Sequence, residues 1–201
     1  MATLSKSLLN VVACAGGLLL LAGCGGNVPA PTSYTNYNAK DGSFSCDCPE
    51  GWNCQGGGKQ TQWVKCKSGG ATVEIKTSIL GSMMGELAEA RNNEFGPGPI
   101  DDSMTPVAKV HDSRKEAFAE DYKNYEEQPA TTVKSNRGDV RVSEFTASGP
   151  LGGKIHGYRA TALGHDVSVH IACTCSESNW PTLQPAYDHV IASLGRGQRT
   201  R

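Results

Sequence analysis

The sequence lacks an excess of charge of either sign, with 19 lysines and arginines against 20 aspartates and glutamates and a formal net charge of −1. A nucleic-acid-binding domain normally carries a basic surface, so the composition argues against a nucleic-acid partner. The sequence also lacks common enzyme signatures: there is no Gly-x-Ser-x-Gly elbow, His-Glu-x-x-His motif, phosphate loop or dinucleotide fingerprint. These absences favour a binding or structural role over an enzyme, and no cofactor is predicted.

Long apolar runs are also scarce. The run near the N-terminus covers residues 8–21 and is interrupted by glycine, whereas a stable membrane helix needs about 20 apolar residues. It follows the cation Lys6 and ends in small residues, which is the order of a signal peptide. The end of the run, Leu21-Ala22-Gly23-Cys24, resembles the lipobox of bacterial lipoproteins.

The lipobox resemblance implies that residues 1–23 are removed, that the Cys24 sulfur carries a thioether lipid, and that the new amino group is acylated, as with palmitate. Stable anchoring takes more than one acyl chain. The alternative is an uncleaved signal anchor in which Cys24 has no role. Gly25, in place of Asp, indicates the periplasmic face of the outer membrane in bacteria that sort lipoproteins by this residue.

The mature chain is predicted to have three parts. Residues 24–40 carry the lipid and form a flexible tether rich in Gly, Pro, Ser, Thr and Asn. Residues 41–195 have the length of one domain. Residues 196–201 form a basic tail with Arg196, Arg199 and Arg201, for which fraying is favoured over contact with anionic lipid.

Alternating apolar and polar residues predict strands in two groups, separated by helices. The predicted strands are 43–48, 60–67, 71–77, 140–147, 154–163 and 166–175, with a loop at 55–59. Helical spacing predicts helices after Ser82, over 113–127, and from Asn179 to Gly195, with Pro181 in the first turn of the last. This order indicates an α+β fold with a central antiparallel sheet of about six or seven strands flanked by helices.

The two ends of the domain resemble a known family. Asp41-Gly42-Ser43-Phe44, followed by Cys48-Pro49-Glu50-Gly51-Trp52, is similar to the opening of PsbP-like domains, and the segment from Trp180 to Leu194 is similar to their last helix. The resemblance covers residues 41–195 and implies an α/β/α sandwich around an antiparallel sheet. Photosynthetic members help to retain calcium and chloride at a manganese cluster, and other members bind protein partners. These are scaffold motifs, so the resemblance implies the fold and assigns no functional residue.

Six further cysteines follow Cys24, and an even number in an exported chain favours disulfides. Same-face neighbours on a strand lie about 6.6–6.8 Å apart, whereas a disulfide prefers a Cα separation of about 5.5–6 Å. Each Cys-x-Cys pair therefore needs partners elsewhere. If the two strands that carry these pairs are antiparallel neighbours, the predicted bonds are Cys46–Cys175, Cys48–Cys173 and Cys54–Cys66.

Two alternatives to this pairing remain open. Cys46, Cys48, Cys173 and Cys175 can supply a four-thiolate site for zinc or copper(I). The cysteines can also stay reduced and pack as small core residues. Export favours disulfides over both alternatives.

The histidines do not form a catalytic pattern in the sequence. His165 and His170 are five residues apart on one predicted strand and therefore face opposite sides of the sheet. His111 lies near a predicted helix start, where capping is favoured, and His156 and His189 have no visible partner. For each of them a surface or hydrogen-bonded role is favoured over catalysis. Arg137-Gly138-Asp139 is interpreted as a hairpin turn and not as an adhesion motif.

These observations predict a lipid-anchored module of the cell envelope that binds or supports another envelope protein. The membrane is the expected partner of the lipid, and the protein partner is not identified by the sequence. A zinc- or copper-binding envelope protein is the alternative function. An enzyme with a site assembled from scattered residues is the third possibility.

Overall fold

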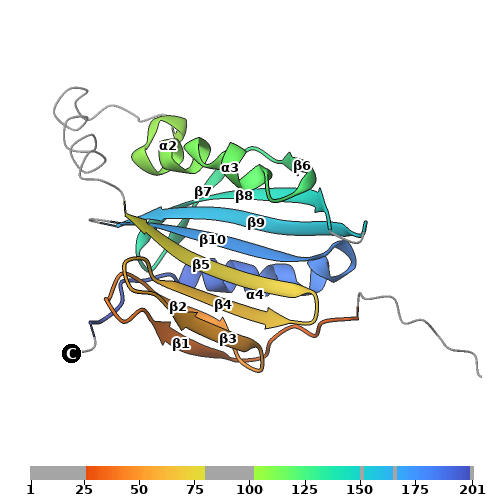
Figure 1. Ribbon diagram of the computed structural model, residues 1–201, viewed down its shortest axis with the longest axis horizontal. Coiled ribbons are helices and arrows are strands. Elements are labelled where there is room, and N and C mark those ends of the chain that lie inside the picture. The colour runs from red at the N-terminus through yellow and green to blue at the C-terminus, as the bar shows by residue number, and fades with distance from the viewer. Residues whose placement is uncertain (1–25, 80–101, 150–151, 165–166, 200–201) are drawn as a thin grey trace, which may run out of the picture.

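The computed structural model describes residues 26–79, 102–149, 152–164 and 167–199. The predicted signal peptide, Cys24, the helix after Ser82 and His165 lie outside these residues. The main feature is an eight-stranded antiparallel sheet in the order β3-β4-β5-β10-β9-β8-β6, with β7 also paired to β8 (Figure 1). Its strands are β3 (Asn53–Gly57), β4 (Trp63–Ser68), β5 (Ala71–Ile79), β6 (Lys123–Glu127), β7 (Thr131–Ser135), β8 (Gly138–Ser148), β9 (Lys154–Leu163) and β10 (Val167–Ser176).

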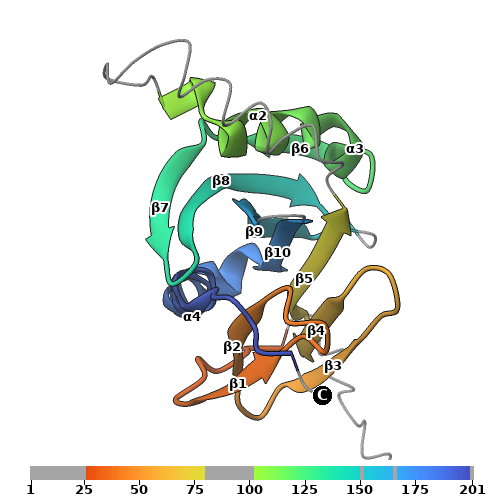
Figure 2. The ribbon, with the colours of Figure 1, turned by 90° about the vertical axis from the view of Figure 1, so that its left-hand side faces the viewer.

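Helices and a hairpin cover the two faces of this sheet (Figure 2). One face carries α2 (Pro106–Ser113) and α3 (Lys115–Ala119), which follow the short 3-10 turn η1 (Asp102–Met104). The other face curves around α4 (Trp180–Ser193), which follows the 3-10 turn η2 (Glu177–Asn179). A separate two-stranded sheet, β1 (Tyr34–Asn38) with β2 (Ser45–Pro49), packs beside α4. The fold is therefore mostly antiparallel sheet, as predicted, with more strands and less helix than an α/β/α sandwich.

The central strands match the alternation in the sequence. On β10 the residues Val169, Ile171, Cys173 and Cys175 are buried against α4 and the hairpin, as the period of two predicts. Ile171 lies opposite Ile75 on β5 and Ala160 on β9, which places β10 in the middle of the sheet.

The last helix also follows its sequence pattern. Pro181 lies in the first turn of α4, and the apolar stripe that includes Leu183, Tyr187 and Val190 is fully buried. The Tyr187 hydroxyl donates to the carbonyl oxygen of Thr174 at 2.8 Å, so this large side chain is buried with its polar atom satisfied. Within the described residues, no helix has the length and apolar character needed to cross a membrane.

Two local predictions were wrong. Residues 55–59 were expected to form a loop, but Asn53–Gly57 is the edge strand β3, paired with β4. Residues 113–127 were expected to form one helix, but they contain α3, a turn and β6. Phe118, Tyr122 and Tyr125 share one aromatic cluster around Phe145, so their helix-like spacing reflects packing on β8 from a helix, a turn and a strand.

The predicted tether and tail are also more ordered than expected. The segment 34–38 forms β1, and Val28 is buried, so the flexible part cannot extend through residues 26–40. After α4 the chain pairs with β2, where Ser45 and Gly195 exchange backbone hydrogen bonds of 3.0 and 2.8 Å. Arg199 then donates from Nε to the Asp41 carbonyl oxygen at 3.2 Å, so the tail does not fray immediately after residue 195.

Candidate functional site

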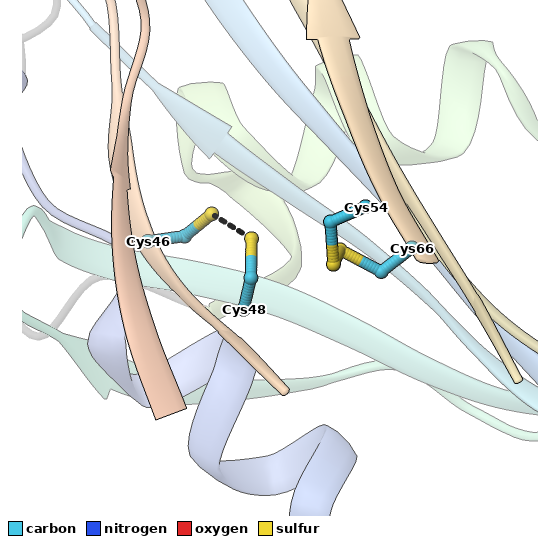
Figure 3. The surroundings of a disulfide bond; sticks show 4 residues. All are labelled: Cys46, Cys48, Cys54 and Cys66. Atoms are coloured by element: carbon cyan, nitrogen blue, oxygen red, sulfur yellow. Dashed lines mark hydrogen bonds between the residues drawn. A yellow bond between two sulfur atoms is a disulfide. The ribbon is translucent and has the colours of Figure 1, made fainter. Parts of the chain in front are cut away.

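Four sulfur atoms gather between the β1–β2 hairpin and the edge of the main sheet (Figure 3). Cys46 and Cys48 project from the buried face of β2, and their Sγ atoms are 3.9 Å apart. Cys54 and Cys66 lie directly opposite each other on β3 and β4 and form the predicted disulfide. The Sγ atoms of Cys48, Cys54 and Cys66 all lie within 4.8 Å of one another. We call these four residues the sulfur cluster; Cys54 is exposed and the other three are buried.

The two other predicted disulfides are not formed. Cys46, Cys48, Cys173 and Cys175 are free thiols, so the bonds Cys46–Cys175 and Cys48–Cys173 are wrong in this structure. The physical reason is the position of β2, which belongs to the small sheet, whereas the neighbours of β10 are β5 and β9. The alternative four-thiolate set does not converge either, because the cysteines that come together in the described part of the chain are Cys48, Cys54 and Cys66.

The free thiols differ in acidity. The hydrogen bond between the two thiols of β2 raises the pKa of Cys46 well above its usual value and lowers the pKa of Cys48. Burial raises the pKa of Cys173, and it raises that of Cys175 to about 11. Cys48 is therefore the free thiol most easily ionised, and the two cysteines of β10 pack as neutral core residues.

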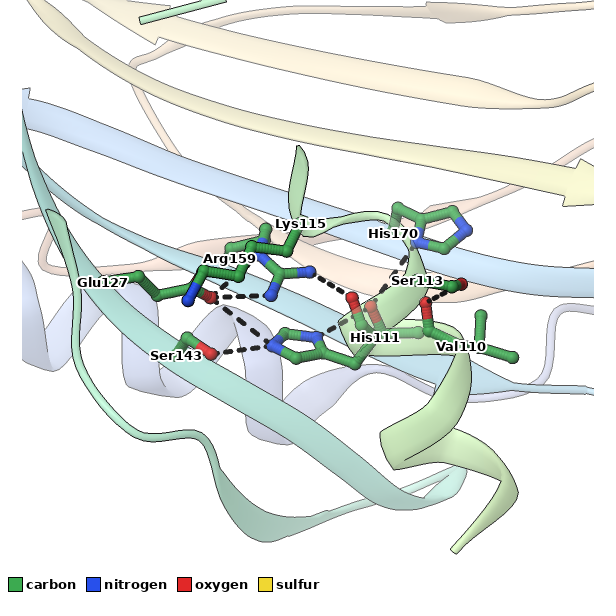
Figure 4. Close-up of polar contacts among 9 residues, drawn as sticks. Val110, His111, Ser113, Lys115, Glu127, Ser143, Arg159 and His170 are labelled. Carbon is green, nitrogen blue, oxygen red and sulfur yellow. Dashed lines mark hydrogen bonds and ion pairs between the residues drawn. The ribbon is translucent and has the colours of Figure 1, made fainter. Parts of the chain in front are cut away.

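A buried group of polar residues lies between α2 and the outer face of the sheet (Figure 4). His111 is completely buried, with Nε2 2.7 Å from Ser143 Oγ on β8 and Nδ1 3.0 Å from Thr161 Oγ1 on β9. Arg159 donates from Nε and Nη2 to Glu127 Oε1 at 2.9 and 2.6 Å, and from Nη1 to the carbonyl oxygen of His111 at 2.6 Å. We call His111, Glu127, Ser143, Arg159 and Thr161 the α2 polar cluster.

The α2 polar cluster contains a serine–histidine hydrogen bond, which raises the question of nucleophilic catalysis. Burial, with a further contribution from Arg159, lowers the pKa of His111 to about 3. A general base works best with a pKa near the operating pH, and this imidazole is too weak a base to take a proton near neutrality. Ser143 is also only 2% exposed, so substrate has no access to it. The cluster therefore fastens α2 to the sheet.

Glu127 is the charged centre of this arrangement. Burial alone would raise its pKa, but hydrogen bonds from Ser143 and Arg159 outweigh that effect and lower it. The carboxylate is thus held ionised beside the guanidinium of Arg159, with Lys115 Nζ 3.6 Å from Oε2. A buried pair of this kind is tolerated because both partners are paired and hydrogen-bonded.

Two surface pockets flank the sheet. The sheet-face pocket, of about 380 Å³, lies beside α3 and is lined by residues that include Arg114, Phe118, Arg159 and His170. Its groups are already paired within the protein: Arg114 donates to Ser78 Oγ at 2.7 Å, and His170 Nε2 lies 2.7 Å from Ser168 Oγ.

The second pocket, of about 430 Å³, lies between β7, β8 and the C-terminal half of α4. Its lining includes the apolar side chains of Val133, Val142 and Ile191, with Glu144 and Asp188 as acidic residues. Burial raises the pKa of the Asp188 carboxyl. We call this the helix-end pocket.

The described histidines have hydrogen-bonded or paired roles, as predicted. His156 Nε2 lies 2.6 Å from Glu144 Oε1 and its ring stacks on Trp180, with centroids 4.0 Å apart. His189 Nε2 lies 3.0 Å from Asp47 Oδ2. The expectation that His111 caps a helix start was wrong, because α2 begins at Pro106 and His111 lies in its last turn. The predicted turn around residues 137–139 is confirmed, since Ser135 and Gly138 close the β7–β8 hairpin.

Sequence reasoning missed Glu127, Ser143 and Arg159. A signal for them exists in the central strands, where Arg141 and Ser143 on β8 and Arg159 and Thr161 on β9 are polar at every second position. Such spacing indicates one polar face that must find buried partners. The partners themselves come from α2 and β6, which no local pattern connects to these strands.

Comparison with solved structures shows the fold. The chain is similar to cyanobacterial PsbP (CyanoP) from Synechocystis sp. PCC 6803, with 15% identity and a TM-score of 0.56 over 88% of this chain and 98% of that one. A protein of Bacteroides thetaiotaomicron matches with 13% identity and a TM-score of 0.50, over 81% of this chain and 48% of that one. LpqN of Mycobacterium tuberculosis, involved in cell envelope biogenesis, matches with 11% identity and a TM-score of 0.41, over 86% of this chain and 83% of that one.

No protein-family model matches the sequence, and the comparison with curated proteins found no match. The similarity to cyanobacterial PsbP nevertheless confirms the fold that was predicted from the two ends of the domain. At these identities the likeness extends to the architecture alone.

Proposed function

We propose that the protein is a lipid-anchored module of the cell envelope that binds a partner protein through the helix-end pocket. The observation that carries the proposal is the placement of the N-terminal segment and the pocket at opposite ends of α4. The lipobox resemblance at Cys24 supports the anchor. The shared fold with cyanobacterial PsbP supports a compact module built on a curved sheet.

The N-terminal segment is fastened to the start of α4. The backbone N–H of Val28 donates to Asn179 Oδ1 at 3.2 Å, and Asn179 Nδ2 donates to the Gly26 carbonyl oxygen at 3.3 Å. Cys24 precedes Gly26 by only two residues, which span at most about 7 Å when extended. A lipid on Cys24 therefore holds this end of the helix close to the bilayer surface.

The helix-end pocket then faces away from the membrane. The helix α4 has 14 residues and is about 21 Å long at 1.5 Å per residue. Ile191 and Ala192, which line the pocket, lie in the last turn of α4, at the far end from Asn179. An anchor at one end and a pocket at the other present the pocket to a partner in the aqueous compartment.

The pocket has the chemistry of a protein contact. Val142 and Ile191 supply apolar surface, and Val133 on β7 is 37% exposed. The charged lining residues are Lys134, Glu144 and Asp188, of which Lys134 pairs with Asp139 and Glu144 with His156. Apolar area contributes binding energy while the charges select the partner. The matching ligand is a polypeptide segment that offers an apolar side chain to Val133, Val142 and Ile191.

Fractionation tests the anchor. We expect the wild-type protein in the membrane fraction, with Cys24 as the mature N-terminus by mass spectrometry, carrying a thioether lipid on its sulfur and an acyl group on its amino group. The Cys24→Ser protein should keep its signal segment uncleaved. An intact, unmodified N-terminus on a wild-type protein recovered from the cytosol would contradict the proposal.

Crosslinking tests the pocket. A photoreactive amino acid at Val133 should capture one envelope protein repeatedly in living cells. The photoreactive amino acid at position 79 is the matched control, because Ile79 is 63% exposed and does not line the pocket. If neither position gives a crosslinked product, or if both positions give the same products, the pocket is not the binding site.

A further inference from the structure

The sulfur cluster places a free thiol next to a disulfide. Cys48 Sγ lies within 4.8 Å of both sulfur atoms of the Cys54–Cys66 bond, and Cys46 Sγ lies 3.9 Å from Cys48 Sγ (Figure 3). Cys48 lies on the small sheet and the disulfide lies at the edge of the main sheet. The packing of one sheet against the other therefore brings them into contact. Thiol–disulfide exchange needs such a contact between a thiolate and a disulfide sulfur.

We propose that the sulfur cluster is a thiol–disulfide exchange site, in which Cys48 attacks Cys66 and releases Cys54 as a surface thiol. The Cys54–Cys66 bond breaks and a Cys48–Cys66 bond forms. The electron pair of the broken bond leaves on the Cys54 sulfur, which takes up one proton in place of the proton lost by Cys48. One disulfide and two thiols are present before and after the step, so no external oxidant or reductant is consumed.

Exposure decides which sulfur leaves. Cys54 is exposed, whereas Cys66 is fully buried. A thiolate released at Cys54 is solvated by water, and a thiolate released at Cys66 would be a buried charge without a partner. Attack on Cys66 with departure of Cys54 is therefore the favoured direction.

The environment of the attacking thiol fits this role. The hydrogen bond from Cys46 lowers the pKa of Cys48, and the thiolate is the attacking species. Cys46 thus acts as a positioning residue. In contrast, burial raises the pKa of the other two free thiols, Cys173 and Cys175, and both lie outside the sulfur cluster.

The backbone around Cys54 can accommodate the change. It lies on β3, an edge strand that, within the described residues, pairs with β4 alone. Gly56 and Gly57 end the strand, and Gly58 follows it. Displacement of Cys54 from Cys66 therefore disturbs one ladder and a glycine-rich turn, not the centre of the sheet. The result is a reactive thiol at the surface of an exported protein, able to exchange with a disulfide of another molecule.

Alkylation of the full chain, purified without reductant, tests the proposal. The folded protein is treated with N-ethylmaleimide at pH 8, quenched in acid and digested with trypsin and a protease that cuts after glutamate. Cleavage after Glu50 separates Cys48 from Cys54, and fragmentation of the peptide 41–50 in the mass spectrometer distinguishes Cys48 from Cys46. We expect label to accumulate on Cys54 together with peptides that link Cys48 to Cys66, because alkylation traps the released thiol.

Three variants make the test specific. Cys48→Ser should lower Cys54 labelling at least tenfold and leave Cys54–Cys66 as the link. Cys173→Ser is the matched control, a buried thiol outside the sulfur cluster, and should behave as the wild type. Cys46→Ala should slow the labelling of Cys54 without changing the link that is finally trapped.

Two results would overturn the proposal. One is a wild-type protein in which Cys54 stays unlabelled and Cys54–Cys66 is the only link. The other is equal labelling of Cys54 in the wild type and in Cys48→Ser. If circular dichroism shows that Cys48→Ser is unfolded, the link map of the wild type decides by itself, since a Cys48–Cys66 peptide requires the exchange.

Discussion

Lowering the pH from 7 to 5 should destabilise the protein through His111. Its ring is completely buried, and burial together with Arg159 lowers its pKa from 6.5 to about 3. An unfolded histidine titrates near pH 6.5. Between these two values the unfolded state binds more protons than the folded state, so the stability from His111 is fully present above about pH 6.5 and falls as the pH drops towards 3.

The size of the effect follows from the difference between the pKa of His111 in the folded protein and its pKa in the unfolded chain. One pKa unit corresponds to about 1.36 kcal/mol, so protonation of His111 in the unfolded chain removes about 2 kcal/mol between pH 7 and pH 5. Burial also lowers the pKa of His170, to about 4, so this residue acts in the same direction. The lowered pKa of Glu127 removes stability only below about pH 4.5, outside this window.

Urea unfolding at pH 7 and pH 5 measures this contribution. The His111→Gln variant should be less stable than the wild type at pH 7 but should lose about 2 kcal/mol less on acidification. Val110→Ala is the matched control, because Val110 is a buried residue of the same helix without a titrating group. It should lower stability by about 1–3 kcal/mol at both pH values and keep the wild-type pH dependence. An unchanged pH dependence in His111→Gln would refute the reasoning.

Three further predictions concern stability. Gly157→Ala should destabilise the protein strongly or prevent folding, since its Cβ would lie 2.1 Å from a carbonyl oxygen of β10, and expression with a thermal melt checks this. Arg159→Met should cost about 3–5 kcal/mol in urea unfolding, because it leaves the carboxylate of Glu127 buried without its guanidinium partner; Lys154→Met, an exposed change on the same strand, should cost less than about 0.5 kcal/mol. Cys54→Ser with Cys66→Ser should lower stability by about 3 kcal/mol, the value for a loop of this length, and a loss below about 0.5 kcal/mol would contradict the chain-entropy argument.

The strands were predictable where one face of the sheet is buried. The alternation at residues 166–175 and the apolar stripe of the last helix both match the structure, because a period of two or of 3.6 records which side faces the core. The edge strand β3 was missed because Asn53–Gly57 is largely exposed, so its residues carry no burial pattern. The region 113–127 was misread because its aromatic residues meet through tertiary packing on Phe145.

The sites were less predictable than the strands. The Cys54–Cys66 disulfide was predicted as the short-loop pair that remained once the two Cys-x-Cys pairs were assigned to each other, and the structure confirms it. The other cysteine pairings required β2 and β10 to be neighbours, which no local pattern determines. The α2 polar cluster joins side chains from α2, β6, β8 and β9, and only its members on β8 and β9 left a polar alternation in the sequence.

Local patterns in the sequence were enough to predict the sheet-rich architecture, the last helix, a hairpin turn next to Gly138 and a lipid anchor at Cys24. They were enough because burial on one face, turn chemistry and cleavage signals act through residues close together in the chain. Three features follow from long-range contacts alone: β2 belongs to a separate small sheet, its two cysteines lie against the Cys54–Cys66 disulfide, and His111 is held neutral beside the Glu127–Arg159 pair. These contacts join segments far apart in the sequence. Their energies depend on the distances between side chains and on their burial, which cannot be read from residue spacing along the chain.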